Sequence, residues 1–305
     1  MSAVRRGVSA LVLTLVMMLT VISPASAHAG GLSPSGVRGD VVSVTPAVPG
    51  LTVRAIEDGA RLLVRNDTGQ PVEIPAGGGQ AAAVPVPDGE TRTWIDGRAT
   101  TLERDLGTAA TRPWAVPLTV GGVRVTVAGE HVAEPPPNAL GWWSVAFGAA
   151  AALIVLTRRS RRPDVTLAVT GLVTVVASLV HVVGATLAVE SAPLWGTFVD
   201  ATGIGLLVWP LVVVAAIGAL RGSAGGVLGV CAGAGLSVVF ILPDLTVFHY
   251  AVLPVAGPPA LDRFLVAVVL GAGCAVAVAG AGTLRALAAR TRPEPTLTHS
   301  ESELS

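Results

Sequence analysis

The sequence predicts an α+β membrane protein, with an exported N-terminal β-sandwich followed by a bundle of five transmembrane helices. The composition supports the membrane assignment, because 51% of the 305 residues are hydrophobic and only 13% are charged, far from the average of soluble proteins. The distribution of these residues supports two parts. Residues up to about 138 are mixed in character, whereas residues from about 139 to 284 are mostly Val, Leu, Ala and Gly.

Residues 1–27 have the three parts of a secretory signal peptide. Two arginines stand near the start, an apolar run follows, and the small residues Ala-Ser-Ala end at Ala27. The apolar run is shorter than the roughly 20 residues that a transmembrane helix needs. Cleavage after Ala27 makes His28 the first residue of the mature chain; an uncleaved anchor is the alternative.

The segment 28–138 shows the short alternating runs that are typical of β-strands. The stretch LTVRAIEDGARLLVRN predicts two strands around a turn at Asp58-Gly59. The stretch VPLTVGGVRVTVAGEHV predicts a second hairpin at Gly121-Gly122, where glycine tolerates the positive φ of a tight turn. Several short strands at this spacing favour a small β-sandwich in an extracytoplasmic domain.

The predicted sandwich must be held together by packing, because the segment 28–138 contains no cysteine for a disulfide. Trp94 and Trp114 are its largest apolar residues. We expect both in the core, and a ligand-facing surface is the alternative.

The segment 139–284 contains five apolar stretches of helical length, and polar residues 285–305 follow as a disordered tail. The candidate spans are about 140–157, 165–188, 201–220, 226–243 and 261–284.

Arginines give the bundle a direction. Those between and after the spans fall almost entirely on one side, and the loops of the other side are acidic. Because positive loops stay in the cytoplasm, the β domain is expected outside the cell membrane and the C-terminus inside. The cytoplasmic arginines are Arg158, Arg159, Arg161, Arg162, Arg221, Arg285, Arg290 and Arg292, and the charged residues on the opposite side are Glu190, Asp200, Asp244, Asp262 and Arg263.

His181 stands alone in the apolar run TVVASLVHVVGATLAVE. It lies about 24 Å along the helix from Val165, which places it in the outer third of a bilayer core of roughly 30 Å. Small residues share its helical face, so the ring is expected to point into the bundle. These neighbours are Thr174, Ala177, Ser178, Gly184, Ala185 and Ala188.

Asp244 and His249 are expected to lie at a depth similar to that of His181, so the three side chains could converge near the outer face of the membrane. Two imidazoles and a carboxylate suit a transition metal such as copper or zinc. The same groups could carry protons, because an imidazole titrates near neutral pH. A single buried histidine with a hydrogen bond across helices is the third alternative.

His28 offers a second candidate metal site. A histidine at a mature N-terminus presents its α-amine and its ring, and one more imidazole completes three nitrogens of the kind Cu(II) favours. His131 is the other histidine of the exported segment. A flexible N-terminal tail is the alternative.

The signal ending at Ala27 and His28, the β-sandwich and the multi-span bundle resemble, in layout, bacterial copper proteins of the CopC class fused to CopD-like membrane domains. The stretches VVSVTPAVPGLTVRAIEDGARLLVRNDTGQPVEI and WAVPLTVGGVRVTVAGEHVAEPPPNALGWW are similar to an uncharacterised actinobacterial multi-pass membrane protein family. That resemblance covers most of the chain and implies a copper-handling context.

These observations favour a membrane-anchored binding or accessory protein, with extracytoplasmic copper as its hypothetical ligand. A small transporter or transporter subunit that uses His181 is one alternative, and a scaffold for other membrane or extracytoplasmic proteins is another. No catalytic motif is found, so an enzyme is not predicted. The net charge of zero argues against nucleic acid as a partner and leaves membrane lipid as the expected surroundings.

Overall fold

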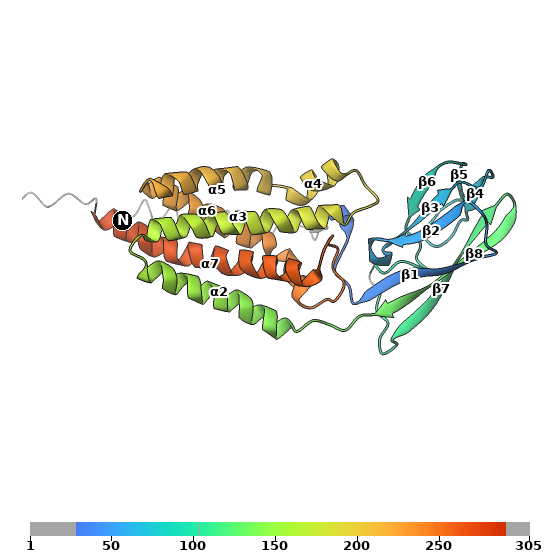
Figure 1. The fold of residues 1–305 in the computed structure, drawn as a ribbon, viewed down its shortest axis with the longest axis horizontal. Helices are drawn as coiled ribbons and strands as arrows, with labels where there is room; N and C mark the ends of the chain where they lie inside the picture. Colours follow the sequence, from blue (N-terminus) through green and yellow to red (C-terminus); the bar gives the residue numbers. More distant parts are fainter. Residues whose placement is uncertain (1–28, 103, 291–305) are drawn as a thin grey trace, which may run out of the picture. The chain divides into compact units, whose positions relative to one another are not determined.

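The computed structural model of the protein describes residues 29–102 and 104–290 (Figure 1). These residues form two compact units. The β unit contains the chain up to Pro137 together with Val182–Ala201 and His249–Pro259. The helical unit contains Asn138–His181, Thr202–Phe248 and the chain from Ala260 onward. An N-terminal β region followed by helices agrees with the predicted α+β class.

Two antiparallel sheets make up the β region. The larger sheet has the strand order β1-β8-β7-β4-β5, and the smaller has the order β2-β3-β6. The short helix η1 (Ala29–Gly31) precedes them. The strands are β1 (Val37–Thr45), β2 (Leu51–Ile56), β3 (Arg61–Asn66), β4 (Val72–Ile74), β5 (Val84–Val86), β6 (Thr91–Trp94), β7 (Thr111–Val120) and β8 (Val123–Ala133).

Both predicted hairpins are confirmed. The helix η2 (Glu57–Gly59) joins β2 to β3, and Gly121 and Gly122 join β7 to β8. Both glycines have positive φ, 54° and 85°, which residues with a side chain rarely adopt. The tight turn therefore fixes the register of the two longest strands, so that Val120 lies opposite Val123.

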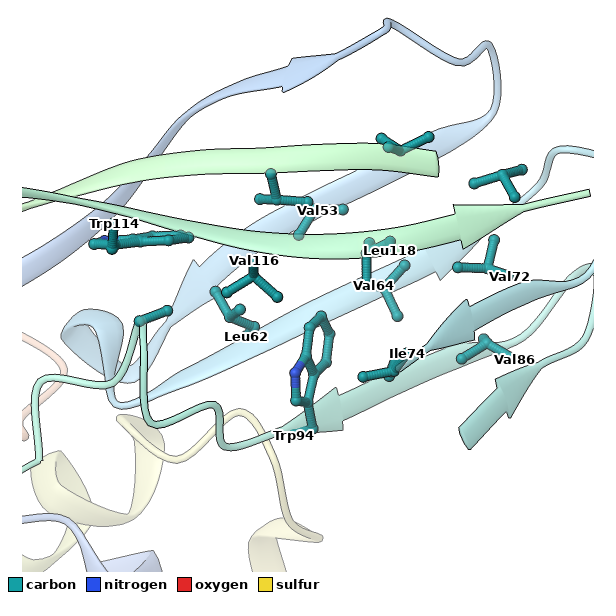
Figure 2. Packing of buried hydrophobic residues seen from close by; sticks show 14 residues of the cluster. Val53, Leu62, Val64, Val72, Ile74, Val86, Trp94, Trp114, Val116 and Leu118 are labelled. Carbon is teal, nitrogen blue, oxygen red and sulfur yellow. The ribbon is translucent and has the colours of Figure 1, made fainter. Parts of the chain in front are cut away.

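The two sheets share one hydrophobic core, as expected for a sandwich (Figure 2). Alternate residues of β7 and β8 are buried, because side chains alternate between the faces of a strand. Val116 and Leu118 from the large sheet pack with Leu62 from the small one. Trp94 and Trp114 are 6% and 7% exposed and belong to this core, so the expected core role of both is confirmed.

Two segments between the helices complete the β unit. Ser35 and Val252 exchange backbone hydrogen bonds of 2.9 and 3.0 Å. The side chain of Glu57 is fully buried, and its Oε1 accepts hydrogen bonds from the amides of Glu190 and Ser191 at 3.1 and 3.0 Å. Arg61 pairs with the same carboxylate. The sandwich is therefore held to both segments by backbone and buried polar contacts.

Among the described residues, four helices are long and apolar enough to cross a membrane, and a broken pair raises the number to as many as five. The pair is α4 and α5, which meet at a bend of 65°. Several such helices fit a membrane protein. The helices are α2 (Ala139–Arg159), α3 (Pro163–Leu187), α4 (Leu194–Thr202), α5 (Gly205–Leu220), α6 (Ala224–Ile241), η3 (Pro243–Phe248) and α7 (Pro259–Arg290).

The helix predicted at 201–220 differs most from the structure. It begins at Gly205, and the separate helix α4 precedes it. Gly203 has a φ of 49° between the two, which interrupts regular helical geometry. The helix predicted at 226–243 begins two residues earlier, because the side chain of Ser223 caps it by accepting from the amide of Gly226.

Candidate functional site

Four ionisable side chains are buried in the described part of the helical unit. The exposed fractions are 7% for His181, 7% for Asp244, 3% for Asp262 and 7% for Arg263. Ionisable groups inside a transmembrane bundle are costly, and they usually pair with one another and serve a function. These four residues therefore define the candidate site.

Helix α3 positions His181 by its periodicity. Leu167, Thr170, Thr174, Ala177 and His181 follow one another at alternating intervals of three and four residues, so they form one stripe along the helix. All five are buried, which confirms the prediction that His181 points inward. Its ring lies six residues before the end of α3 at Leu187, about 9 Å along the axis.

The imidazole of His181 lies between two carboxylates. Its Nδ1 is 2.6 Å from Oδ1 of Asp262, and its Nε2 is 3.4 Å from Oδ2 of Asp244. Asp262 stands in the first turn of α7, and Asp244 in the first turn of η3. Both positions suit a carboxylate, because the first backbone amides of a helix leave a partial positive charge there.

The geometry favours a protonated imidazole in this cluster when both carboxylates are ionised. An ionised carboxylate has only acceptor atoms, so a ring nitrogen must carry a hydrogen to bond to it. Because both nitrogens of His181 face carboxylates, the ring satisfies both contacts only as the doubly protonated imidazolium. Hydrogen bonds between charged groups of this kind are shorter and stronger than neutral ones.

Arg263 completes the charge balance. Its Nε donates a hydrogen bond of 2.9 Å to the backbone oxygen of Val247. With His181 protonated, two negative carboxylates and two positive side chains are buried together. Burying charges is tolerated only when they are paired, so this balanced state is the one that the fold stabilises.

The structure brings together only part of the predicted group. His181 and Asp244 form an ion pair. His249 is exposed and belongs to the β unit. His28 lies outside the described residues.

His131 is buried in the core of the β unit. Its Nε2 lies 2.8 Å from the backbone oxygen of Ala99, and its ring centroid lies 6.2 Å from that of Trp114. The Nδ1 atom is buried without a hydrogen-bond partner in the described structure. Burial lowers the pKa of His131 below its ordinary value of 6.5, against the opposing effect of the Ala99 hydrogen bond. His131 is therefore a neutral core residue.

Within the described residues, no group of three or more His, Cys, Asp or Glu side chains is arranged to hold a metal ion. The cluster around His181 illustrates the reason. Nδ1 and Nε2 lie on different edges of the ring, and each carboxylate approaches one of them. Each carboxylate oxygen contacts one ring nitrogen, and these atoms do not point toward a common position that a metal ion could occupy.

Sequence reasoning missed Asp262 and Arg263 as members of the site and counted them only as outer-side charges, although both fall at the start of the predicted span 261–284. One signal could have identified them. Pro259 favours the first turn of a helix, and the residues after Arg263 are apolar for more than five turns. The two charges therefore belong to a membrane-spanning helix, where ionisable residues mark functional sites.

A scan against protein-family models finds no match, and searches of the curated proteins and of the solved structures find none either.

Proposed function

We propose that this chain is a multi-pass membrane protein whose helical unit binds and releases a proton at His181, as a small transporter or a transporter subunit does. One observation carries the proposal: both ring nitrogens of a buried histidine face carboxylates, Asp262 at 2.6 Å and Asp244 at 3.4 Å. Chains of Asp, Glu and His inside transmembrane bundles are the usual components of proton pathways.

The charge balance links proton release to another event. When His181 loses its proton, Arg263 is the remaining buried positive side chain among the described residues, so two buried carboxylates face one buried positive charge. A buried uncompensated charge costs several kcal/mol, about as much as breaking a buried ion pair. Entry of water or a cation, or a movement of α3 against α7, must accompany the release. Such a requirement is the basis of coupling in transport.

Proton flux into proteoliposomes tests the proposal. Vesicles that contain a pH-sensitive dye are given a potassium gradient and valinomycin, which drive proton entry. We expect wild-type protein to acidify the lumen faster than protein-free vesicles, and His181→Gln to abolish the difference. Thr174→Val is the matched control, because Thr174 is buried on the same stripe of α3 and its hydroxyl bonds only to the backbone oxygen of Thr170 among the described contacts. Equal rates for wild type and His181→Gln contradict the proposal.

The β unit is proposed to face the outside of the cell membrane, with the arginines that follow α2 and α5 in the cytoplasm. The positive-inside distribution supports this orientation, since Arg158 and Arg159 end α2. Alkaline phosphatase fused after Pro136 should be active, and the same enzyme fused after Thr298 should be inactive. The reverse pattern would invert the orientation.

A role in extracytoplasmic copper handling depends on the sequence alone. It requires His28, placed after Ala27, as a ligand of the mature N-terminus. Metal analysis of protein purified from copper-supplemented cells tests it. Copper retained by wild type and lost in His28→Ala supports the hypothesis, and no bound copper in the wild type removes it.

A further inference from the structure

Helix α4 (Leu194–Thr202) carries three large apolar side chains at neighbouring positions, of which Leu194 and Trp195 are exposed and Phe198 is half-buried. Leu194 is 55% exposed and Trp195 is 74% exposed. The ring of Phe198 stacks on Trp195 with centroids 6.0 Å apart and an angle of 27° between the planes. Residues three and four positions apart are neighbours on a helix, so the three side chains form one continuous surface.

Another side of α4 packs within the β unit. Thr197 is 6% exposed, and Ala201 packs against a small hydrophobic cluster that includes Ala29 and Val189. Asp200 is exposed and lies about 140° around the helix from Trp195. The helix is thus amphipathic, with one face fixed to protein, the charge on another, and the aromatic pair on a third.

The chain position of α4 indicates what covers the aromatic face. The helix stands between α3 and α5, two apolar helices. Its nine residues extend only about 13.5 Å, too short to cross a bilayer, and it meets α5 at a bend of 65°. A short amphipathic helix in such a place lies within reach of the membrane surface.

We propose that α4 is an interfacial helix, and that Trp195, Phe198 and Leu194 insert into the headgroup and upper acyl region of the bilayer. Tryptophan is enriched at this depth, because its ring is apolar and its indole N–H still needs a polar partner. The helix contains no Lys or Arg. It therefore recognises the apolar–polar boundary of the bilayer, because the helix has no basic side chain that would attract anionic lipids.

This assignment has a structural consequence. Because Ala201 joins the cluster of Ala29, Leu32 and Ala60, an inserted α4 holds the β unit at the membrane surface. The membrane-crossing segment then begins after Gly203.

Depth measurements with spin labels test the inference on the full chain. In a background in which Cys231 and Cys274 are replaced by Ala, single cysteines are introduced as Trp195→Cys, Val42→Cys and Leu211→Cys. Val42 is 66% exposed on the sandwich and reports water, and Leu211 is 67% exposed on the apolar helix α5 and reports lipid. Each label is compared in phosphatidylcholine vesicles for collision with oxygen, which concentrates in lipid, and with a water-soluble nickel chelate.

We expect an oxygen-to-nickel collision ratio for the label at position 195 that lies between the two reference values. The label of Asp200→Cys, on the other side of the same helix, should give a lower ratio than that at 195. Adding anionic phosphatidylglycerol to the vesicles should not change the ranking of the collision ratios at these positions. If the Trp195→Cys protein does not fold, as judged by size-exclusion chromatography, Leu194→Cys on the same face replaces it.

Two results would overturn the inference. A ratio equal to that of Val42 means that the aromatic face is in water, and a ratio equal to that of Leu211 means that α4 is the outer part of a transmembrane span. If the label at position 195 gives an intermediate ratio only in vesicles that contain phosphatidylglycerol, the helix binds through lipid charge and the assignment is contradicted. None of these outcomes depends on proton binding at His181.

Discussion

The Nδ1 atom of His181 lies 2.6 Å from Oδ1 of Asp262, although 81 positions of the chain separate the two residues. The contact joins the buried stripe of α3 to the first turn of α7 within the helical unit. Both side chains are buried, so neither can exchange its partner for water. Each side chain therefore needs the other to compensate its charge.

The first prediction concerns the cost of breaking this pair. His181→Leu should destabilise the protein by about 3–5 kcal/mol, because it leaves buried carboxylates without their proton donor. Replacement of a pair together is far better tolerated, so the double variant His181→Leu with Asp262→Leu should lose much less than the sum of the two single changes. Thermal unfolding in detergent, followed by circular dichroism, measures all three variants. Additive losses would show that the two residues are not coupled.

Part of the site could be predicted from sequence, because the information was local. The small residues that share the helical face of His181 predicted that its ring points into the bundle, and Asp244 was expected near it because it follows the predicted span 226–243. The contact with Asp262 depends instead on how α3 and α7 pack, and no periodicity within one helix encodes that. His249 was predicted to converge from its position in the loop alone, and its side chain is exposed.

The second prediction concerns Glu57, the buried carboxylate that holds the segment around Ser191 to the sandwich. Glu57→Gln replaces one of the two carboxylate oxygens with an NH₂ group, so that a donor faces either the two amides at Oε1 or Arg61 at Oε2. The loss of these contacts should cost about 1–3 kcal/mol locally. Hydrogen exchange at the amides of Glu190 and Ser191 should then accelerate about tenfold or more.

Arg54 provides the control for this experiment. It forms an ion pair of 3.7 Å with Glu190 on the same segment, but the two side chains are 58% and 50% exposed. Exposed ion pairs contribute little to stability, so Arg54→Ala should leave the exchange of these amides unchanged. Equal acceleration in both variants would assign the effect to general loosening and remove the special role of Glu57.

The third prediction concerns the packing of Gly129 in β8. A Cβ atom at this position would overlap the ring of Trp114 and the backbone oxygen of Asp40. Gly129→Ala should therefore destabilise the β unit by about 1–3 kcal/mol through overpacking. Gly36→Ala is the control, because a Cβ there meets no atom within 4 Å. Tryptophan fluorescence during urea unfolding measures both variants, and a neutral Gly129→Ala would contradict the tight packing of Trp114.

The fold shows the same division between local and non-local information. Gly121-Gly122 and the turn before Arg61 predicted the β7–β8 and β2–β3 hairpins, because turn chemistry acts over a few residues. The pairing of β1 with β8 joins Val37 to Ala133, and sequence alone did not predict it. Helix α4 was also missed, because its apolar residues continue the pattern of the following helix, and the break depends on a positive φ at Gly203.

The fourth prediction is an acid sensitivity that originates at His131. Burial lowers its pKa below 6.5, so folding favours the neutral ring. When the folded-state pKa is lowered, the unfolded state binds the proton first, and stability that is fully present above pH 6.5 is lost as the pH falls below that value. Protonation would also place a hydrogen on the buried Nδ1, which has no acceptor in the described structure. Urea unfolding of the full chain, followed by tryptophan fluorescence, should therefore give a midpoint for the β unit that decreases as the pH falls from 7 to 5. His131→Gln keeps a donor for the Ala99 oxygen and cannot titrate, so it should lower the midpoint at pH 7 and flatten its dependence on pH. An unchanged slope in that variant would assign the acid sensitivity to other groups, such as the carboxylates of the sandwich surface.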